Sequence, residues 1–170
     1  MARPSQGVEV AAALKAAATS PLRGRKMKKD PNCIFCKVAA SEIPCCQVFQ
    51  DECSLAFLDI GPLAEGHVLL IPREHFPTID QMPADQAAAM LRNLPRLVGA
   101  VRSATGCQGV NVLQNNGRAA SQVVPHVHLH IIPRSDGDEF HFNWPAGAYV
   151  QGRMEAVADK IRKRLGGARL

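Results

Sequence analysis

The residues with the clearest potential for chemistry are three of the six histidines, which stand at alternate positions: His126, His128 and His130. Side chains alternate between the two faces of a β-strand, so these imidazoles are expected on one face. The apolar residues between them are expected on the opposite face, in the core: Val127, Leu129 and Ile131. An imidazole cluster on a strand can bind a metal ion, or it can act as a nucleophile or acid-base group. This segment alone leaves both hypotheses open.

A Cys-x-x-Cys pair, Cys33 and Cys36, favours a metal site elsewhere in the chain. Zinc takes about four nitrogen and sulfur ligands, and such a pair supplies two of them from one turn. The remaining two ligands have four candidates: His67, His75, His126 and His141. A redox pair of the thioredoxin type is disfavoured, because no parallel βαβ pattern surrounds the cysteines.

A closed zinc site that uses two cysteines and two histidines would leave imidazoles free for other chemistry. An imidazole with one nitrogen held by a hydrogen bond can attack phosphorus with the other nitrogen. The nearby segment 115–122, Asn-Asn-Gly-Arg-Ala-Ala-Ser-Gln, could donate hydrogen bonds to phosphate oxygens. The chain has no phosphate-binding glycine loop of the Walker or Rossmann type. Phosphate chemistry here would therefore be histidine chemistry.

Short strands must position these groups. Five are expected: residues 47–50, 54–59, 66–72, 109–114 and 126–132. The first three are separated by the turn at Asp51-Glu52 and the break at Gly61-Pro62, and strands linked so closely favour an antiparallel meander. Asn115-Asn116-Gly117 predicts a turn after the fourth strand.

Three helices are expected beside the sheet: residues 33–39, 83–105 and 152–165. The second is the main helix, which carries apolar residues at three- and four-residue spacing and ends at Gly106. Pro95 lies inside it and is expected to kink or locally unwind it. The predicted fold class is α+β, an antiparallel sheet of about five strands with a main helix and a C-terminal helix.

The formal net charge of +5 belongs to an N-terminal tail. Residues 1–30 hold seven basic and two acidic side chains, which leaves 13 of each sign in the rest of the chain. A neutral domain does not favour a specific nucleic-acid partner. We expect residues 1–30 to form a flexible basic tail, with Met27 as an alternative initiator, and residues 31–170 to form the domain, C-terminal helix included.

The composition also bears on compartment and membrane association. No apolar run approaches the ~18 residues of a transmembrane helix, so no membrane partner is expected. The Ala-rich segment 8–19 is interrupted by Lys15 and precedes the basic cluster, an order that is not typical of a secretory signal. We therefore expect a reducing, cytoplasmic setting for the six cysteines.

Four separated segments together resemble the histidine triad (HIT) family: residues 126–132 (His-Val-His-Leu-His-Ile-Ile), 113–117 (Leu-Gln-Asn-Asn-Gly), 56–60 (Ala-Phe-Leu-Asp-Ile) and 66–72 (Gly-His-Val-Leu-Leu-Ile-Pro). The similarity spans roughly residues 32–134 and is closest to the bacterial Hint-like branch, whose members often open with Cys-Ile-Phe-Cys. It implies a HIT-like fold and a homodimer, with the main helix and fourth strand at the interface and the sheet continued across it.

The resemblance implies cleavage of a purine nucleoside phosphoramidate or a related nucleoside 5′-phosphate derivative, for example a dinucleoside polyphosphate. His128 would attack the α-phosphorus and form a covalent nucleotidyl-histidine, which water then cleaves. His130 would bind and polarise the phosphate, the backbone carbonyl of His126 would orient His128, and His67 matches a further family histidine near the site. The competing hypothesis is a nucleotide-binding regulatory or scaffold protein with incidental turnover.

The family's ligand-binding residues match positions in several motifs. Asp59 matches the ribose-binding acid. The purine pocket matches Phe35, Phe57 and Ile60, and the phosphate-binding segment matches Asn115, Gly117 and Gln122. Members with the opening cysteine pair resemble proteins with a structural zinc ion, whose ligands would here be Cys33, Cys36, His75 and His126. No organic cofactor is implied.

Two positions depart from the family pattern. Val123 stands where many Hint-type proteins have a serine near the leaving group, which puts side-chain donation to that group in question. Pro125 replaces a usual aromatic or other apolar residue and stiffens the entry to the strand. The third histidine, His130, is more typical of hydrolases than of the related nucleotidyltransferases, which have glutamine. The sequence assigns no role to His141, Trp144 or the C-terminal helix.

Overall fold

The computed structural model describes residues 27–141 and 145–166. The expected flexible tail, residues 1–30, therefore lies almost wholly outside the described residues, as does Trp144. Contacts within the chain divide it into two compact units, Met1–Asp138 and Glu139–Leu170. The domain boundaries expected from the sequence stay predictions.

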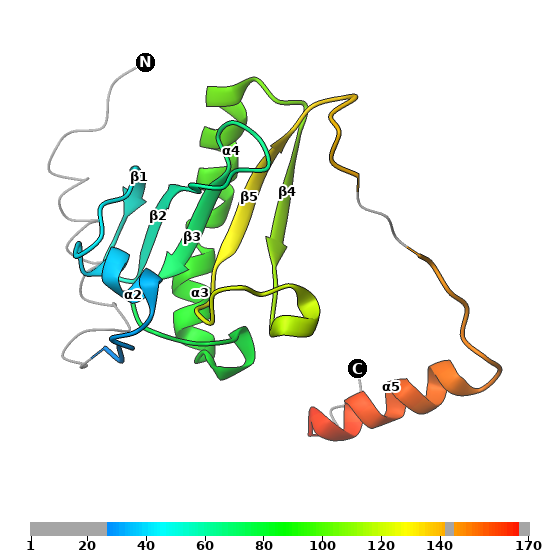
Figure 1. Ribbon diagram of the computed structural model, residues 1–170. Coiled ribbons are helices and arrows are strands. Elements are labelled where there is room, and N and C mark those ends of the chain that lie inside the picture. Colours follow the sequence, from blue (N-terminus) through cyan, green and yellow to red (C-terminus); the bar gives the residue numbers. More distant parts are fainter. Residues whose placement is uncertain (1–26, 142–144, 167–170) are drawn as a thin grey trace, which may run out of the picture. The chain divides into compact units, whose positions relative to one another are not determined.

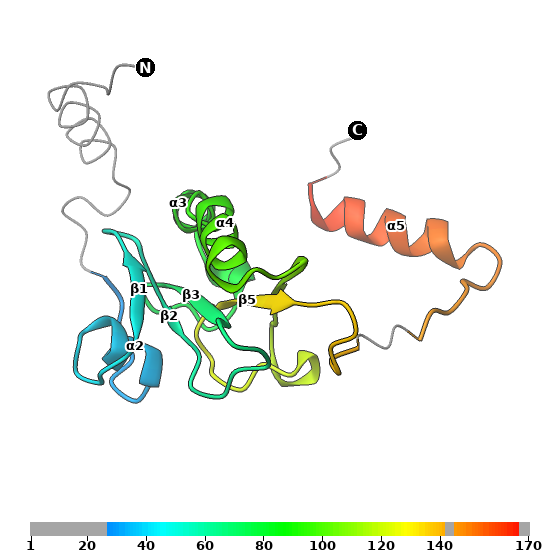
Figure 2. The same cartoon turned by 90° about the horizontal axis from the view of Figure 1, so that it is seen from above.

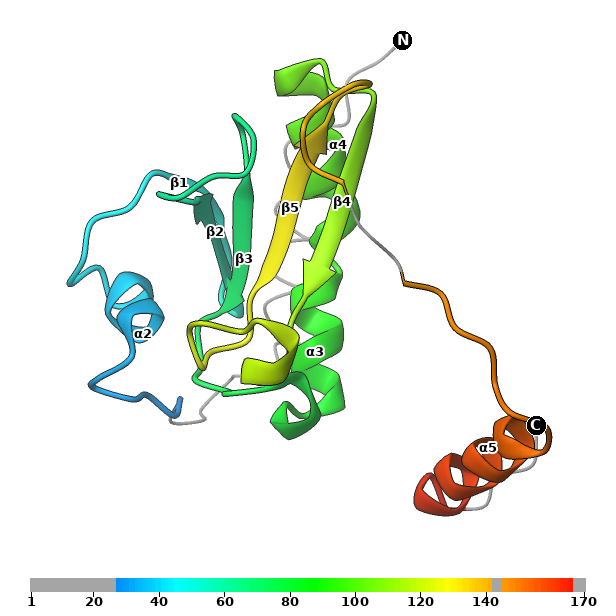
Figure 3. The ribbon, with the colours of Figure 1, turned by 45° about the vertical axis from the view of Figure 1, so that its right-hand side comes forward.

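In its described part, residues 27–138, the first unit contains one sheet of five antiparallel strands in the order β1-β2-β3-β5-β4 (Figure 1). The strands are β1 (Gln47–Gln50), β2 (Ser54–Leu58), β3 (Val68–Pro72), β4 (Gly109–Gln114) and β5 (Leu129–Arg134). The predicted antiparallel sheet and the meander of its first three strands are confirmed. β5 runs between β3 and β4 (Figure 3), which brings the segment that precedes it to the middle of the sheet.

The strand predicted at residues 126–132 begins later, at Leu129, and ends at Arg134. His126 and Val127 donate their backbone N–H groups to loop carbonyls, those of Val124 at 2.8 Å and Phe76 at 2.7 Å. Because these groups are bonded to loops, residues 126–128 form a lead-in to the strand, with His126 in a bend. Of the three alternating histidines only His130 lies within the strand.

The sheet separates two apolar cores. On one face lie α3 (Ala84–Leu91) and α4 (Leu94–Thr105), and on the other lies the short helix α2 (Ile34–Ala39) (Figure 2). Alternate residues of β3 divide between these cores, with Leu70 in the first and Leu69 in the second. Residues 127, 129 and 131 all join the core under α3 and α4, so the predicted apolar face is confirmed.

The predicted main helix is divided into α3 and α4. Pro95 is in the first turn of α4, where the N–H that proline lacks would have no helical partner. At the joint, Asn93 donates its backbone N–H to Met90 O at 3.2 Å and its side-chain amide to Asp51 Oδ2 at 2.6 Å. The unwinding expected from Pro95 is confirmed. Gly106, at φ 68°, ends α4 in the left-handed conformation, as predicted.

The second unit contains one helix within its described residues, α5 (Arg153–Arg164), which falls inside the predicted range of residues 152–165. Within the described parts of the chain, no helix is both long enough and apolar enough to cross a bilayer.

Candidate functional site

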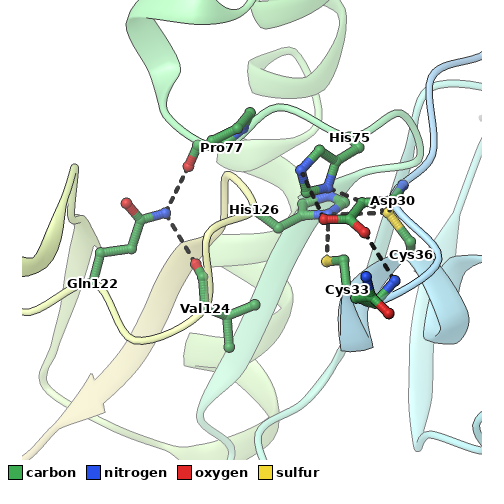
Figure 4. Close-up of polar contacts among 9 residues, drawn as sticks. Asp30, Cys33, Cys36, His75, Pro77, Gln122, Val124 and His126 are labelled. Carbon is green, nitrogen blue, oxygen red and sulfur yellow. Dashed lines mark hydrogen bonds and ion pairs between the residues drawn. The ribbon is translucent and has the colours of Figure 1, made fainter.

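Two cysteines and two histidines converge at the end of β3. Cys33 and Cys36 come from the start of α2, and His75 and His126 come from the loops after β3 and before β5 (Figure 4). His126 Nδ1 lies 3.4 Å from Cys33 Sγ and 3.7 Å from Cys36 Sγ, and His75 Nδ1 lies 3.4 Å from Cys36 Sγ. The four ligand atoms all lie within 4.8 Å of one another.

Backbone groups orient this cluster. His126 Nε2–H donates to the carbonyl of Pro72 at 3.0 Å, which leaves the Nδ1 lone pair directed toward the thiols. Burial lowers the pKa of His126 to about 4, so the ring is neutral, as a metal ligand must be. Asp30 contributes its backbone N–H to Cys36 Sγ at 3.4 Å, and its carboxylate lies 3.9 Å from His75 Nε2.

The donor set fits zinc. Tetrahedral bonds of ~2.3 Å to sulfur and ~2.0 Å to nitrogen place those two ligand atoms about 3.5 Å apart, close to the observed separations. Burial also raises the pKa of the Cys36 thiol to about 11. A thiolate there therefore needs a cation beside it. The arrangement can hold a metal ion with no ligand position left for substrate.

A second histidine group lies on the same lead-in. His128 Nδ1 is 2.6 Å from the backbone carbonyl of His126. A carbonyl only accepts, so Nδ1 carries the proton and the neutral ring keeps its lone pair on Nε2. Within the described residues Nε2 has no hydrogen-bond partner. His126 thus faces the thiols with its side chain and holds His128 with its carbonyl.

The tautomers of His67 and His130 follow from a chain of hydrogen bonds. The backbone N–H of Leu63 donates to His67 Nδ1 at 3.2 Å, so the proton of neutral His67 is on Nε2. That Nε2 lies 3.0 Å from His130 Nδ1, which must accept. His130 therefore carries its own proton on Nε2 and can donate it to a ligand.

Burial keeps these two imidazoles neutral. Burial is the largest of the causes that lower the pKa of His130 to about 4. Repulsion from His128 and His67 lowers this pKa further, and the attraction of Asp59 raises it. Burial also lowers the pKa of His67, against the attraction of Asp59. Both rings therefore act as hydrogen-bonding groups of fixed direction near neutral pH.

Asp59, His67 and His130 also lie close enough together to be considered as a metal site. The three side chains are arranged in a line, however, with His67 in the middle. Its Nδ1 faces Asp59 Oδ2 at 3.7 Å, and its Nε2 faces His130. A metal ion needs one nitrogen from each ring, all directed at one point. The hydrogen bonds favour a relay that fixes the direction of His130.

A cavity of about 380 Å³ opens beside the second histidine group. His128 and His130 line it, together with the four residues expected to bind the nucleoside: Phe35, Phe57, Asp59 and Ile60. The aromatic side chains are buried and pack edge to face, with ring centroids 5.8 Å apart. An apolar wall beside a carboxylate and two imidazoles suits a purine, its ribose and its phosphate.

Phe35 links the two groups. It stands between the two cysteines in sequence, and its ring packs edge to face against His126 at 5.9 Å and His128 at 5.3 Å. A metal ion held by Cys33 and Cys36 would therefore also fix a wall of the cavity.

The predicted phosphate-binding residues, Asn115, Gly117 and Gln122, are not among the residues that line the cavity. The Gln122 side chain accepts from Gly117 N–H at 2.7 Å and donates to the carbonyls of Pro77 at 2.7 Å and Val124 at 3.0 Å, the last two shown in Figure 4. Gln122 thereby anchors the loop from residue 117 to residue 124. Contacts of Asn115, Gly117 and Gln122 with phosphate stay predictions.

Several functional contacts escaped the sequence-based prediction. Leu63 and Pro72 act through backbone groups, which carry no side-chain signal in a sequence. Asp30 contacts Cys36 and lies near His75, and its Asp-Pro-Asn context, which is typical of a turn, is the one hint that the sequence offers. Ser121 lines the cavity, although the sequence marked it only as part of a polar loop.

Comparisons with known proteins agree with this geometry. A model of the HIT domain matches residues 40–137. The adenosine 5′-monophosphoramidase hnt1 of Schizosaccharomyces pombe is 39% identical over 136 residues, which cover 79% of this chain and 98% of that protein. The adenylylsulfatase HINT3 of Arabidopsis thaliana is 44% identical over 107 residues, which cover 63% of this chain. The match spans only about half of the Arabidopsis protein, 54% of its length.

Among solved structures, a Zn-bound histidine triad family protein from Mycobacterium smegmatis superposes with a TM-score of 0.62 at 32% identity. The match covers 78% of this chain and 97% of that one.

Proposed function

We propose that this chain, which belongs to the HIT domain family, hydrolyses purine nucleoside 5′-phosphate derivatives, with an adenosine phosphoramidate as the first candidate substrate. The observation that carries the proposal is the 2.6 Å hydrogen bond from His128 Nδ1 to the His126 carbonyl. It leaves Nε2 as the free nitrogen of a buried imidazole that lines the cavity. The names of the two curated relatives support the reaction class and the adenylyl group.

His128 is the nucleophile of the proposed reaction. Its Nε2 attacks the α-phosphorus, the bond to the leaving group breaks, and a nucleotidyl-histidine forms. The Nδ1 proton stays on the ring, held by the His126 carbonyl, and the carbonyl dipole stabilises the positive charge that the substituted imidazole acquires. Water then attacks phosphorus and releases the nucleoside monophosphate.

His130 supports both steps as a donor. Its Nε2–H is directed away from His67 and stabilises a non-bridging phosphate oxygen as negative charge develops there. The purine lies against Phe35, Phe57 and Ile60, and the Asp59 carboxylate accepts hydrogen bonds from the ribose hydroxyls. Phosphate contacts from Asn115 and Gly117 complete the proposed site, with Gln122 holding their loop in place through its side-chain amide.

A structural zinc ion belongs to the proposal, held by Cys33, Cys36, His75 and His126. It would fix the start of α2 to the lead-in of β5 and take no part in the reaction. The zinc-bound relative of known structure supports this assignment, together with the fit of the donor set. Metal analysis of protein purified without chelators should find one zinc ion per chain.

A homodimer is also proposed, with β4 and the main helix, α3 and α4, at the interface. β4 is an edge strand, and an edge offers unpaired backbone groups to a second copy. Val112 on β4 is 39% exposed, which leaves apolar surface there for a partner. Light scattering should give twice the mass of the chain, and a monomeric mass would contradict the proposal. We propose a cytoplasmic location, which is supported by the presence of six cysteines with no disulfide among them in the described residues.

The function is tested with His128→Ala and His128→Gly. Release of AMP from an adenosine phosphoramidate should fall by about 10⁴-fold or more, as it does when other covalent nucleophiles are removed. Zinc content should be unchanged, which shows that the fold is intact, and His141→Ala, at an exposed histidine of the second unit, serves as the control. Retained activity in the His128 variants would contradict the mechanism. Tight nucleotide binding by the unaltered protein with negligible turnover on amidates, dinucleoside polyphosphates and acyl-adenylates would instead favour a scaffold role.

A further inference from the structure

The leaving amine needs a proton donor, and none of the residues assigned so far supplies one. In an in-line displacement the leaving atom departs opposite Nε2 of His128 and takes the electron pair of the broken bond. An amine with this pair leaves easily only if it receives a proton. The His128 proton is committed to the His126 carbonyl, and the His130 donor is assigned to a non-bridging oxygen. Another group must therefore donate a proton to the leaving nitrogen.

The loop of residues 121–124 is the part of the cavity wall left for the leaving group. In the proposed complex the purine packs against the cavity wall formed by α2 and β2, and the ribose binds Asp59. Within the loop, Val123 and Val124 are aliphatic and Ser121 carries a hydroxyl. Cys45 also lines the cavity, but it comes from the segment between α2 and β1 and so belongs to the purine wall.

Ser121 is held in a conformation that serine rarely adopts. It follows the short 3-10 helix η2 (Arg118–Ala120) with φ 65° and donates its backbone N–H to Arg118 O at 2.9 Å. Glycine fits this left-handed cap better than any residue with a side chain. The next residue, Gln122, is pinned by three side-chain hydrogen bonds. The Ser121 hydroxyl itself has no partner in the described part of the chain.

Ser41 provides the internal comparison. It too is an exposed serine with positive φ, at 60°, and it donates its backbone N–H to Val38 O at 2.9 Å just after α2. The two serines therefore cap short helices in the same way. Only Ser121 lines the cavity.

We infer that Ser121 is the residue that delivers the proton to the leaving group, an inference that rests on the proposed hydrolase function. As the His128 Nε2–phosphorus bond forms and the phosphorus–nitrogen bond breaks, the leaving nitrogen takes the proton of Ser121 Oγ. Oγ takes a proton from solvent, which reaches it because the residue is exposed. The amine leaves protonated, and the serine hydroxyl is restored.

The test compares adenosine phosphoramidates of alkylamines, which need a proton to leave, with acyl-adenylates, which do not. The value of kcat/KM reports the first chemical step. In Ser121→Ala it should fall about tenfold to hundredfold for the alkylamine amidates and less than about twofold for the acyl-adenylates, whose carboxylate leaves as a stable anion without a proton. Ser121→Gly should behave in the same way, although it relieves the backbone, and this separates loss of the hydroxyl from strain. Ser41→Ala and Ser41→Gly should leave kcat/KM unchanged for both classes of substrate.

An equal loss on the amidates and the acyl-adenylates, or no loss on either, would overturn the assignment of Ser121 while leaving the hydrolase function in place. The same selective loss in the Ser41 variants would also overturn it. Failure of the unaltered protein to cleave any amidate would overturn the proposed function itself.

Discussion

Two clusters share the lead-in to β5: the cysteine cluster, to which His126 belongs, and the histidine group, to which His128 belongs together with His67 and His130. Both contain buried, neutral imidazoles. Burial lowers the pKa of His126 and of His130 to about 4 in each case. In the cluster, the free nitrogen of His126 faces two thiols. In the histidine group, Nδ1 of His130 is held by His67, and Nε2 is left to a ligand in the cavity.

The difference shows that the hydrogen-bond partner, more than the degree of burial, determines what each imidazole can do. Pro72 supplies an acceptor to Nε2 of His126, so the lone pair is on Nδ1 and faces inward. Leu63 supplies a donor to His67, and this sets the proton positions on both His67 and His130. Two backbone groups thus separate the proposed zinc ligand, His126, from the proposed phosphate ligand, His130. The predictions below test this separation.

The largest effect is expected from Cys33→Ser, which should lose zinc and destabilise the fold. The remaining ligands bind more weakly, and metal-binding free energy is folding free energy at such a site. We expect a loss of about 3 kcal/mol or more, which corresponds to a fall in Tm of at least about 10 °C for a domain of this size. Calorimetry and metal analysis measure both. Cys46→Ser, at an exposed cysteine, is the control. Full zinc content in Cys33→Ser would abolish the contrast between the two groups.

His67→Ala should damage the histidine group alone. It removes the donor that fixes the tautomer of His130, so kcat should fall about 10²-fold, the size of effect that one preorganised donor has. Zinc content should stay at one ion per chain. His67→Gln should recover part of the activity, because its amide can still donate to His130 Nδ1. Loss of zinc in either variant would show that the two groups are not separable.

Gln122→Glu should act through stability. A carboxylate cannot donate to the carbonyls of Pro77 and Val124, so the free energy of unfolding should fall by about 2 kcal/mol at neutral pH. Denaturant unfolding gives this value, with the exposed Gln47→Glu as the control. If KM for the nucleotide rises while stability is unchanged, Gln122 is a direct phosphate ligand and not an anchor of the loop.

The smallest effect is a pH dependence of stability. The folded pKa of His130 is about 4, below the ordinary value of 6.5, so the unfolded chain binds the proton first as pH falls. His128, His67 and Asp59 are the titratable groups that face it. Stability should therefore decrease from pH 6.5 toward pH 4, by about 1–2 kcal/mol after allowance for solvent screening. His130→Asn should flatten this part of the curve, and His141→Asn should leave it unchanged. An unaltered slope in His130→Asn would mean that His130 is not buried as a neutral ring.

The elements of the sheet could be predicted because their apolar residues alternate or recur at regular spacing. Leu69 and Leu70 separate into the two cores as a strand requires, and Pro95 marks the break between α3 and α4. The late start of β5 could not be predicted. It depends on carbonyls of Val124 and Phe76, and the position of Phe76 next to residue 127 is set by the tertiary fold.

The site was harder to predict wherever backbone groups decide a role. The alternation of histidines indicated chemistry, but spacing alone left four candidates for the two histidine ligands. The structure places His67 in the other group and brings His75 Nδ1 to 3.4 Å from Cys36 Sγ. The side chain of Gln122 could equally bind phosphate or a carbonyl when read from sequence, because an amide donates and accepts.

The most direct test of the division within the triad is to locate the covalent intermediate. The chain is mixed with adenosine phosphoramidate, quenched in alkali, where phosphoramidates survive, and cleaved with trypsin. The peptide of residues 119–134 contains His126, His128 and His130 and no other histidine. Mass spectrometry should find the adenylyl group on His128 alone, while native spectra of the same reaction show one zinc ion per chain. An adenylyl group on His126 or His130, or turnover that never modifies this peptide, would contradict the account.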